Sequence, residues 1–335
     1  WSLWAALALI ALGSGGIKPC VSAHVGDQFG PSNKQLLPTV YGWFYLSINV
    51  GAALSTLVTP MLLGAFGPGV AFGLPGVLMA LATLVFWLGR RRYVHVPPGG
   101  ESFFAEATSS RGLMAVANLL PLYAVLAVFW SLFDQTTSTW VEQAKHLDRN
   151  LLGWEVSPSQ VQAANPILIL ILVPLFTYVV YPLVERGAAT TPLRRIGAGL
   201  VLAPASFFVV AWLQSRIDAG ETPHLAWQLV AYVAITVSEV LISITALEFT
   251  YTQAPRKMKS LVTGVYWLSV YLGNEIVVQV NTWLVEESAS GEATQDAGYF
   301  RGFAYAMAGT AAFYLVWSRF YRGRTYLQGE EEGEE

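Results

Sequence analysis

Long apolar runs, each about as long as a membrane is thick, follow one another along almost the whole chain. A helix needs roughly 20 predominantly apolar residues to cross a hydrocarbon core of about 30 Å. Nine segments meet this length, and they lie near 1–22, 38–62, 69–91, 114–138, 161–183, 196–214, 225–250, 260–284 and 299–320. They lack the alternating pattern of barrel strands, so helix is the only spanning structure left to them. The sequence therefore predicts an all-α polytopic membrane protein.

The charged residues support these spans and predict an orientation. They make up only 12% of the chain against 54% for apolar residues, which is too few for a water-soluble surface. Short cytoplasmic loops carry an excess of Lys and Arg, so alternate loops should differ. Most of the 19 basic residues fall on one side, and the other side receives Lys145, Arg149, Arg216 and Arg301. We therefore expect a protein of the cytoplasmic (inner) membrane with a cytoplasmic C-terminus.

The connections between the spans are short, and two segments have a distinct composition. Segment 92–113 is rich in Pro, Gly and Ser and lies where a cytoplasmic linker between two helical bundles would fall. Segment 323–335 has the composition of a solvated acidic tail. The chain opens directly in an apolar run, without an initiator methionine or a signal peptide. We therefore expect a fragment that lacks an N-terminal block with an odd number of spans.

Three ionisable residues, Lys18, Asp134 and Glu239, stand alone inside apolar segments. A charge at bilayer depth costs at least about 3 kcal/mol unless a partner or water receives it. Polar and aromatic side chains lie near them at helical spacing, in stripes made of Ser14, Ser22, Trp130, Thr137, Thr236, Ser243, Tyr41, Tyr45, Asn49, Gln162, Asn165, Trp267, Tyr271 and Asn274. These stripes predict a polar cavity inside the membrane, although a buried structural pair would also explain any one charge.

One cation and two carboxylates would suit a zwitterionic solute. Lys18 can hold a carboxylate group and Glu239 an ammonium group, while aromatic side chains can close over apolar groups of varied size. The carboxylates can also carry protons, because helix movement changes their solvation and their neighbours. A channel or a purely structural protein would explain the apolar runs but not these complementary charges.

Enzymatic and metal-binding motifs are not found. The chain has no HExxH or GxSxG motif and no paired catalytic histidines, so we do not expect an enzyme. Its single cysteine, Cys20, and its four histidines show no metal-ligand spacing. We therefore expect no metal site and no cofactor other than protons, and no nucleic-acid partner. Near the inner end of the first span, His24 could titrate close to neutral pH.

Four motifs in order along the chain carry a family resemblance. They are GSGGIKPCVSAHVGDQF at 13–29, FYLSINVGAALSTLVTP at 44–60, FWSLFDQTTSTWVEQA at 129–144 and LEFTYTQAPRKMKS at 247–260. Together they resemble the proton-dependent oligopeptide transporter family, the peptide branch of the major facilitator superfamily. The resemblance implies two six-helix bundles, with the first three helices missing here.

The same resemblance implies the division of the chain into domains. Residues 1–91 would be helices 4 to 6 of the N-terminal bundle, and 92–113 the linker between the bundles. Residues 114–322 would form the C-terminal six-helix bundle, and 323–335 its cytoplasmic tail.

The resemblance also implies roles for individual residues. Lys18 would bind the substrate carboxylate and take part in proton coupling, while Glu239 would receive the peptide amine. Asp134 would act in the outer gate and in proton linkage. The remaining positions that line the peptide pocket would be Asn49, Trp130, Asn165, Ser243 and Trp267.

The implied function is proton-coupled symport of di- and tripeptides by alternating access. The alternative is a transporter of the same fold for another substrate, such as nitrate or a peptide-like conjugate. Retention of both Lys18 and Glu239 favours a zwitterionic peptide. The family's ExxER motif belongs to the first helix, which the resemblance implies lies outside this chain. His24, Val25, Thr136 and Thr137 depart from the usual motif residues, and the last two border the pocket.

Overall fold

The computed structural model describes residues 2–95, 100–151, 153–187, 190–287, 295–321 and 323, and most of them are helical. The first part of the chain contains α1 (Ser2–Asp27), a 3-10 turn η1 (Lys34–Leu36), α2 (Leu37–Phe66) and α3 (Pro68–Gly89). A short helix α4 (Gly100–Thr108) lies within the predicted linker 92–113. Apart from Gly323, the predicted acidic tail lies outside the described residues.

The second part of the chain contains the remaining helices and one small hairpin. The helices are α5 (Ser110–Phe133), α6 (Thr139–Ala144), α7 (Pro158–Val161), α8 (Ala164–Leu175), α9 (Tyr181–Glu185), α10 (Pro192–Asp218), α11 (Ala226–Glu239), α12 (Thr245–Gln253), α13 (Lys259–Glu287) and α14 (Ala297–Phe320). Shorter turns are η2 (Asp134–Thr137), η3 (Phe176–Val180), η4 (Val240–Ile244) and η5 (Arg256–Met258). The antiparallel hairpin pairs β1 (Asn150–Leu151) with β2 (Trp154–Glu155).

Local sequence explains where several helices begin. Ser109 caps α5 by accepting a hydrogen bond from the Gly112 amide, and Asp296 caps α14 by accepting one from the Tyr299 amide. Before α10, Thr191 accepts from the Arg194 amide, and a proline follows at the first helical position. These side chains satisfy amide groups that have no partner inside the helix.

Two long helices are interrupted by π-helical turns close to polar residues. Turn η3 joins α8 to α9 just after Pro174, which lacks the amide hydrogen that a regular helix would use. Turn η4 begins directly after Glu239 and joins α11 to α12. Single π turns inside α-helices occur frequently at functional sites. Their position therefore directs attention to Glu239.

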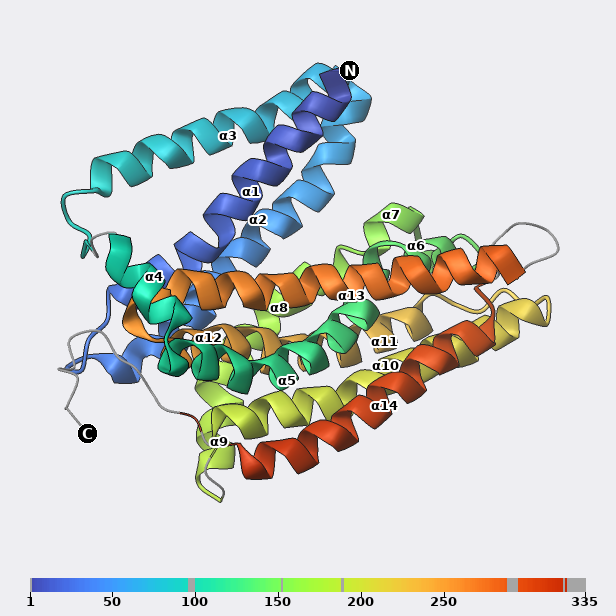
Figure 1. The fold of residues 1–335 in the computed structure, drawn as a ribbon. Coiled ribbons are helices and arrows are strands. Elements are labelled where there is room, and N and C mark those ends of the chain that lie inside the picture. The colour runs from blue at the N-terminus through green and yellow to red at the C-terminus, as the bar shows by residue number, and fades with distance from the viewer. Residues whose placement is uncertain are drawn as a thin grey trace.

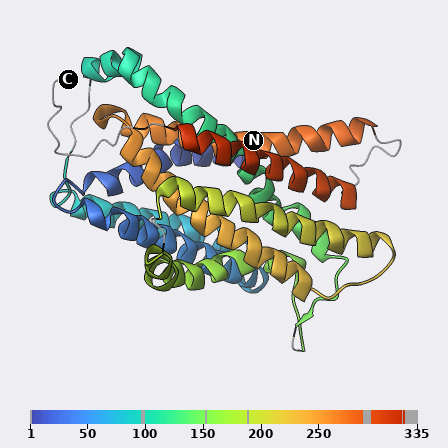
Figure 2. The ribbon, with the colours of Figure 1, turned by 90° about the horizontal axis from the view of Figure 1, so that it is seen from below.

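The buried core lies in the second part of the chain. Helix α10 packs along α11 and α14, and α5 packs along α13 and α14. Figure 2 shows the helices running along a common long direction, with the connections gathered at their ends. Fully buried aromatic side chains, among them Phe129, Trp140, Phe207, Tyr232 and Phe300, fill the space between them.

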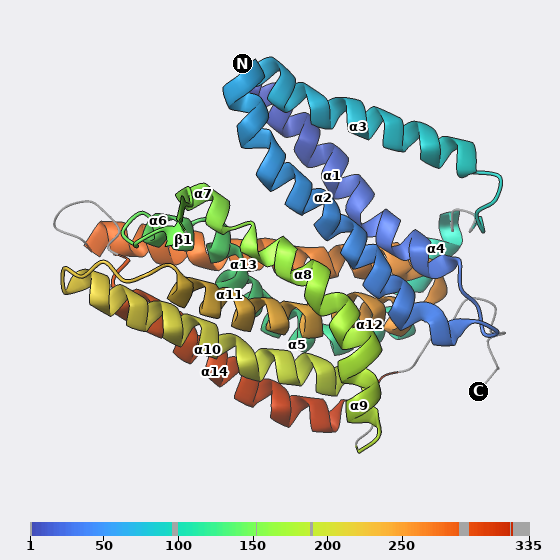
Figure 3. The ribbon, with the colours of Figure 1, turned by 180° about the vertical axis from the view of Figure 1, so that it is seen from behind.

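Helices α1, α2 and α3 lean away from this core. Figures 1 and 3 show, from opposite sides, that they diverge from the other helices toward the N-terminus of α1. At the other end, α1 packs against α13 and α12, and α2 packs against α8. Apolar side chains on the three helices are strongly exposed, including Trp4, Leu12 and Phe72. Such a surface requires lipid or further apolar partners.

Eight helical segments of the described residues are long and apolar enough to cross a membrane, and they match the first eight predicted spans. The ninth predicted span, 299–320, is helical as α14 and packs along α10. It is less apolar than the other eight, so its crossing stays a prediction. The predicted all-α membrane fold is confirmed.

The contact between α5 and α13 depends on Gly273. A Cβ atom there would lie 2.7 Å from the Ala127 carbonyl oxygen, 2.7 Å from the Trp130 Cβ and 2.9 Å from the Ser131 amide nitrogen. Backbone atoms cannot rotate away, so we expect Gly273→Ala to destabilise the fold by about 1–3 kcal/mol. A lower thermal unfolding midpoint in detergent would show this.

Gly264 on the same helix is the matched control for that substitution. An added Cβ there meets no described neighbouring atom within 4 Å. Since alanine has a higher helix propensity than glycine, Gly264→Ala should keep or raise the midpoint. Equal effects of the two substitutions would contradict the close packing of α5 on α13.

Candidate functional site

Glu239 lies at the centre of a polar cluster that joins three helices. It ends α11 and is only 3% exposed. Tyr45 of α2 donates a hydrogen bond to its Oε1. Asn165 of α8 donates to its Oε2 at 2.6 Å and also reaches the Thr236 hydroxyl at 3.1 Å. Both carboxylate oxygens are therefore held by donors from distant parts of the chain.

The donors to Glu239 are neutral, so they orient the carboxylate without compensating its charge. Within the described ranges no basic side chain forms an ion pair with Glu239. An ionised group buried this deeply needs a compensating partner. The arrangement can therefore accept a cationic group or a proton at Glu239.

Two further predicted site residues support this cluster. Asn49 is buried one turn beyond Tyr45 on α2, and its Nδ2 donates to the Tyr45 carbonyl at 2.9 Å. Ser243 is buried in turn η4, four residues after Glu239. The structure therefore brings Asn49, Asn165, Glu239 and Ser243 into one region of the molecule.

Lys18 lies on α1 and contacts an aromatic ring of α13. Its Nζ is 5.2 Å from the centroid of the Trp267 ring, within the range of a cation–π interaction. Lys18 itself is exposed, and Trp267 is half-buried. The positive charge is therefore presented on a surface where an anionic group can approach it.

Trp130 contributes an aromatic wall on α5. It is buried, and its ring packs edge-on against Phe129 and Phe133. Its indole nitrogen has no hydrogen-bond partner within the described part of the chain, and the same holds for Trp267. Both indole N–H groups are therefore buried without a protein partner.

Asp134 occupies the break between α5 and turn η2. Asn274 of α13 donates to its Oδ2 at 2.6 Å, and the charge of Lys18 attracts it. Thr137 departs from the predicted stripe with Trp130 and Asp134, because the 3-10 turn η2 replaces the α-helix after Phe133. Beyond this point Thr137 is exposed, and its hydroxyl binds the backbone carbonyl of Asp134 instead. Asp134 therefore ties the end of α5 to α13.

The prediction of site residues omitted two that make direct contacts with the carboxylates. Tyr45 and Asn274 bind Glu239 and Asp134, yet the sequence placed them only in polar stripes beside other residues. The signal in the sequence was helical spacing: Tyr45 lies four residues before Asn49, and Asn274 lies seven residues after Trp267. His24 packs edge-on against the rings of Phe86 and Tyr93 rather than against these carboxylates.

A separate set of contacts lies at the far end from the divergence, and one of them links α1 to α12. Tyr251 of α12 donates to Asp27 Oδ1 of α1 at 3.0 Å. Tyr41 of α2 donates to the Ser22 carbonyl at 2.9 Å. Lys259 lies over the Tyr251 ring, with Nζ 3.5 Å from its centroid. The hydrogen bond from Tyr251 to Asp27 therefore holds α1 against α12 at this end.

Membrane-length helices around buried carboxylates, amides and an accessible lysine define an integral membrane transporter. The family model described as "POT family" matches residues 1–111 and 101–297. The chain therefore belongs to the proton-dependent oligopeptide transporter family, as the motifs indicated.

Individual relatives agree with this assignment. The chain is 37% identical to "Peptide transporter family 1" of Drosophila melanogaster over 252 residues, 63% of this chain and 34% of that protein. It is 37% identical to "Solute carrier family 15 member 2" of Homo sapiens over 253 residues, 63% of this chain and 35% of that protein. The matched part thus spans about a third of these curated relatives.

The fold is also similar to that of solved transporters. The crystal structure of the "POT family transporter PepTSo" matches with a TM-score of 0.75 and 33% identity, covering 95% of this chain and 78% of that one. An "auto inhibited POT family peptide transporter" matches with a TM-score of 0.73 and 32% identity, covering 94% and 77%. The fold is that of the major facilitator superfamily.

Proposed function

We propose that the complete protein carries di- and tripeptides across the membrane together with protons by alternating access. The observation that carries this proposal is Glu239, which neutral donors from two other helices orient and which no described cation neutralises. A free peptide amine matches such a carboxylate. The peptide carboxylate then matches the exposed Lys18, whose charge lies beside Trp267.

We assign the surrounding residues supporting roles. Asn49, Asn165 and Ser243 hydrogen-bond the peptide or hold Glu239 in place, and Trp130 and Trp267 close over its side chains. Asp134 couples the outer end of α5 to α13 through Asn274. The proton affinities of Lys18, Asp134 and Glu239 change as the helices move. The protein performs no covalent chemistry, and protons are its coupling ion.

The proposed orientation places the C-terminus in the cytoplasm and the protein in the inner membrane, as the basic residues predict. In this orientation the contacts of Asp27, Tyr41 and Tyr251 lie at the cytoplasmic end. The divergence of α1, α2 and α3 lies at the outer end (Figures 1 and 3). The structure then corresponds to an outward-facing state, with Lys18 open to solute from outside.

Uptake by the complete protein in proteoliposomes tests the proposal. A labelled dipeptide should accumulate when the outside is more acidic, and unlabelled tripeptides should compete with it. Equal uptake after the proton gradient is collapsed would contradict proton coupling. Driven uptake of nitrate or of a peptide conjugate without dipeptide uptake would favour the alternative substrate.

A further inference from the structure

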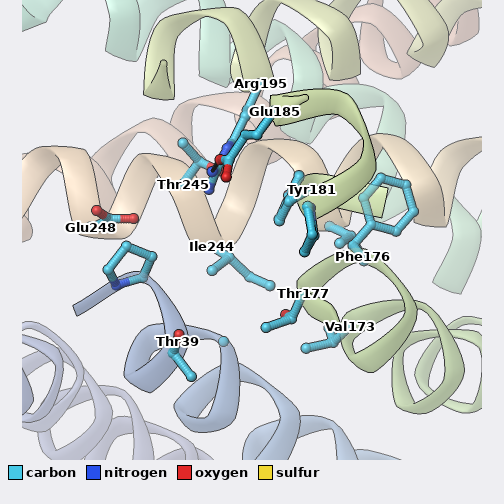
Figure 4. A pocket seen from close by; sticks show the side chains of 14 residues that line it. Thr39, Val173, Phe176, Thr177, Tyr181, Glu185, Arg195, Ile244, Thr245 and Glu248 are labelled. Atoms are coloured by element: carbon cyan, nitrogen blue, oxygen red, sulfur yellow. Dashed lines mark hydrogen bonds and ion pairs between the residues drawn. The ribbon is translucent and has the colours of Figure 1, made fainter. Parts of the chain in front are cut away.

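A polar cavity lies between the first and second parts of the chain, beside the turn that follows Glu239 but without Glu239 in its lining. It has a volume of about 160 Å³ and is enclosed by α2, the segment from α8 to α9, α10, and the segment from η4 to α12. Figure 4 shows Thr39 and Thr177 below it, Glu248 at one side, and Arg195 with Glu185 at the top. A single water needs only about 10–15 Å³ measured this way. The cavity therefore has room for a small polar group.

Glu248 contributes a carboxylate to this cavity without a matching donor. It is half-buried on α12, and no hydrogen bond or ion pair to it occurs among the described residues. The charge of Arg195 attracts the Glu248 carboxylate without a direct contact. A partly buried carboxylate without a direct partner is unfavourable. Such a group is complementary to a cationic ligand.

Arg195 is already engaged by other groups. Its Nη2 lies 3.2 Å from Glu185 Oε1 and 3.1 Å from the Thr190 hydroxyl. Its guanidinium carbon lies 4.0 Å from the centroid of the Tyr181 ring. Because Glu185 balances Arg195, the charge of Glu248 remains as the net charge of the cavity. The cavity is therefore negative.

The cavity extends toward an exposed aromatic surface. A smaller cleft shares Thr39 and Thr177 with it and continues between α2 and α8 to Trp43 and Tyr178. These two aromatic side chains are 52% and 56% exposed. Exposed Trp and Tyr side chains on a membrane protein are typical of the lipid interface. A headgroup can therefore approach from the bilayer rather than from the space around Glu239.

We propose that this cavity binds the primary ammonium of a phosphatidylethanolamine headgroup, with Glu248 as its ion partner. The hydroxyls of Thr39, Thr177 and Thr245 line the cavity and can accept hydrogen bonds from an ammonium, which carries three N–H donors. A trimethylated choline offers none. Arg186 follows Glu185 at the rim and is exposed, so it can meet the lipid phosphate. This proposal does not depend on the transported substrate.

Lipid retention by the complete protein tests the proposal. The protein is reconstituted with phosphatidylglycerol and either phosphatidylethanolamine or phosphatidylcholine of the same acyl chains, and retained lipid is measured by native mass spectrometry. We expect phosphatidylethanolamine to be retained in preference to phosphatidylcholine. Glu248→Gln should lower its retention by about tenfold or more, because a charge-assisted hydrogen bond is lost. Equal retention of both lipids by the unaltered protein would overturn the proposal.

Two further variants distinguish an effect on the cavity from a general loss of structure. Glu142→Gln removes a carboxylate from an exposed ion pair with Lys145 and should leave lipid retention unchanged. Thr177→Leu fills the cavity without altering its charge and should also lower phosphatidylethanolamine retention. If Glu248→Gln or Thr177→Leu elutes as a folded protein and retains the lipid normally, the assignment of the cavity is wrong. If a free dipeptide instead raises the thermal unfolding midpoint only when Glu248 is present, and the protein shows no lipid preference, the ligand is a soluble amine and the lipid proposal is wrong.

Discussion

Glu239→Gln is expected to weaken binding of a dipeptide with a free amine by about ten- to a hundredfold. Glutamine has nearly the same shape and keeps an oxygen that can accept from Tyr45. Its amide group faces Asn165, whose own amide can turn so that its oxygen accepts, and the cluster should then persist. The lost interaction is a charge-assisted hydrogen bond to the peptide ammonium, worth about 1.5–3 kcal/mol, and each 1.4 kcal/mol corresponds to about tenfold in affinity. Calorimetric titration of the complete protein in detergent would measure the change.

The N-acetylated form of the same dipeptide separates this role from a general loss of structure. It carries no ammonium, so Glu239→Gln should change its affinity by no more than about twofold. Glu142→Gln is the matched protein control, because Glu142 pairs with Lys145 on the surface and is 56% exposed. Exposed ion pairs contribute little. An equal loss for the free and the N-blocked peptide would remove the assigned role of Glu239.

The length and apolarity of the runs were sufficient to predict the helices of this protein. Eight predicted spans coincide with helices that can cross a membrane, because hydrocarbon permits so few backbone arrangements. Local departures from the regular helix were not predictable in the same way. The end of α5 at Phe133 and the π turn after Glu239 change which neighbours a side chain meets, while the apolar pattern continues through both.

The candidate site was predicted in part for a similar reason. Isolated charges marked Lys18, Asp134 and Glu239, and the family motifs indicated Asn165, whose contact with Glu239 the structure shows. Tyr45 and Glu239 are 194 residues apart in the chain, so only the packing of α2 against η4 and α12 reveals their hydrogen bond. Glu248 belongs to a motif used to recognise the family. That its carboxylate lines a cavity without a direct partner follows only from the structure.

The two carboxylates on the segment from α11 to α12 lie in different environments. Glu239 accepts hydrogen bonds from α2 and α8. Glu248 lies nine residues later and lines the cavity near Arg195. Turn η4 lies between them and shifts the helical register, so each faces its own set of neighbours. Both sites include residues of α2. Movement of α2 against the second part of the chain would therefore alter both at once.

Lys18→Ala is expected to reduce gradient-driven dipeptide uptake by at least about a hundredfold while leaving peptide exchange measurable. The substitution removes the cation beside Trp267 and its attraction to Asp134, and with them the proposed link between the peptide carboxylate and proton release. Exchange of labelled for unlabelled peptide needs no net proton movement, so weaker binding alone should not abolish it. Both rates would be measured in proteoliposomes, with and without an inward proton gradient.

Lys145→Ala provides the control for Lys18, because Lys145 is 53% exposed and pairs only with the neighbouring Glu142 among the described residues. Its driven uptake should match that of the unaltered protein. Lys18→Arg keeps a positive charge but replaces a compact ammonium with a planar guanidinium that does not give up its proton. We therefore expect Lys18→Arg to retain more peptide binding than Lys18→Ala and still to lose driven uptake. Driven uptake at the normal rate in Lys18→Ala would show that coupling does not pass through this lysine.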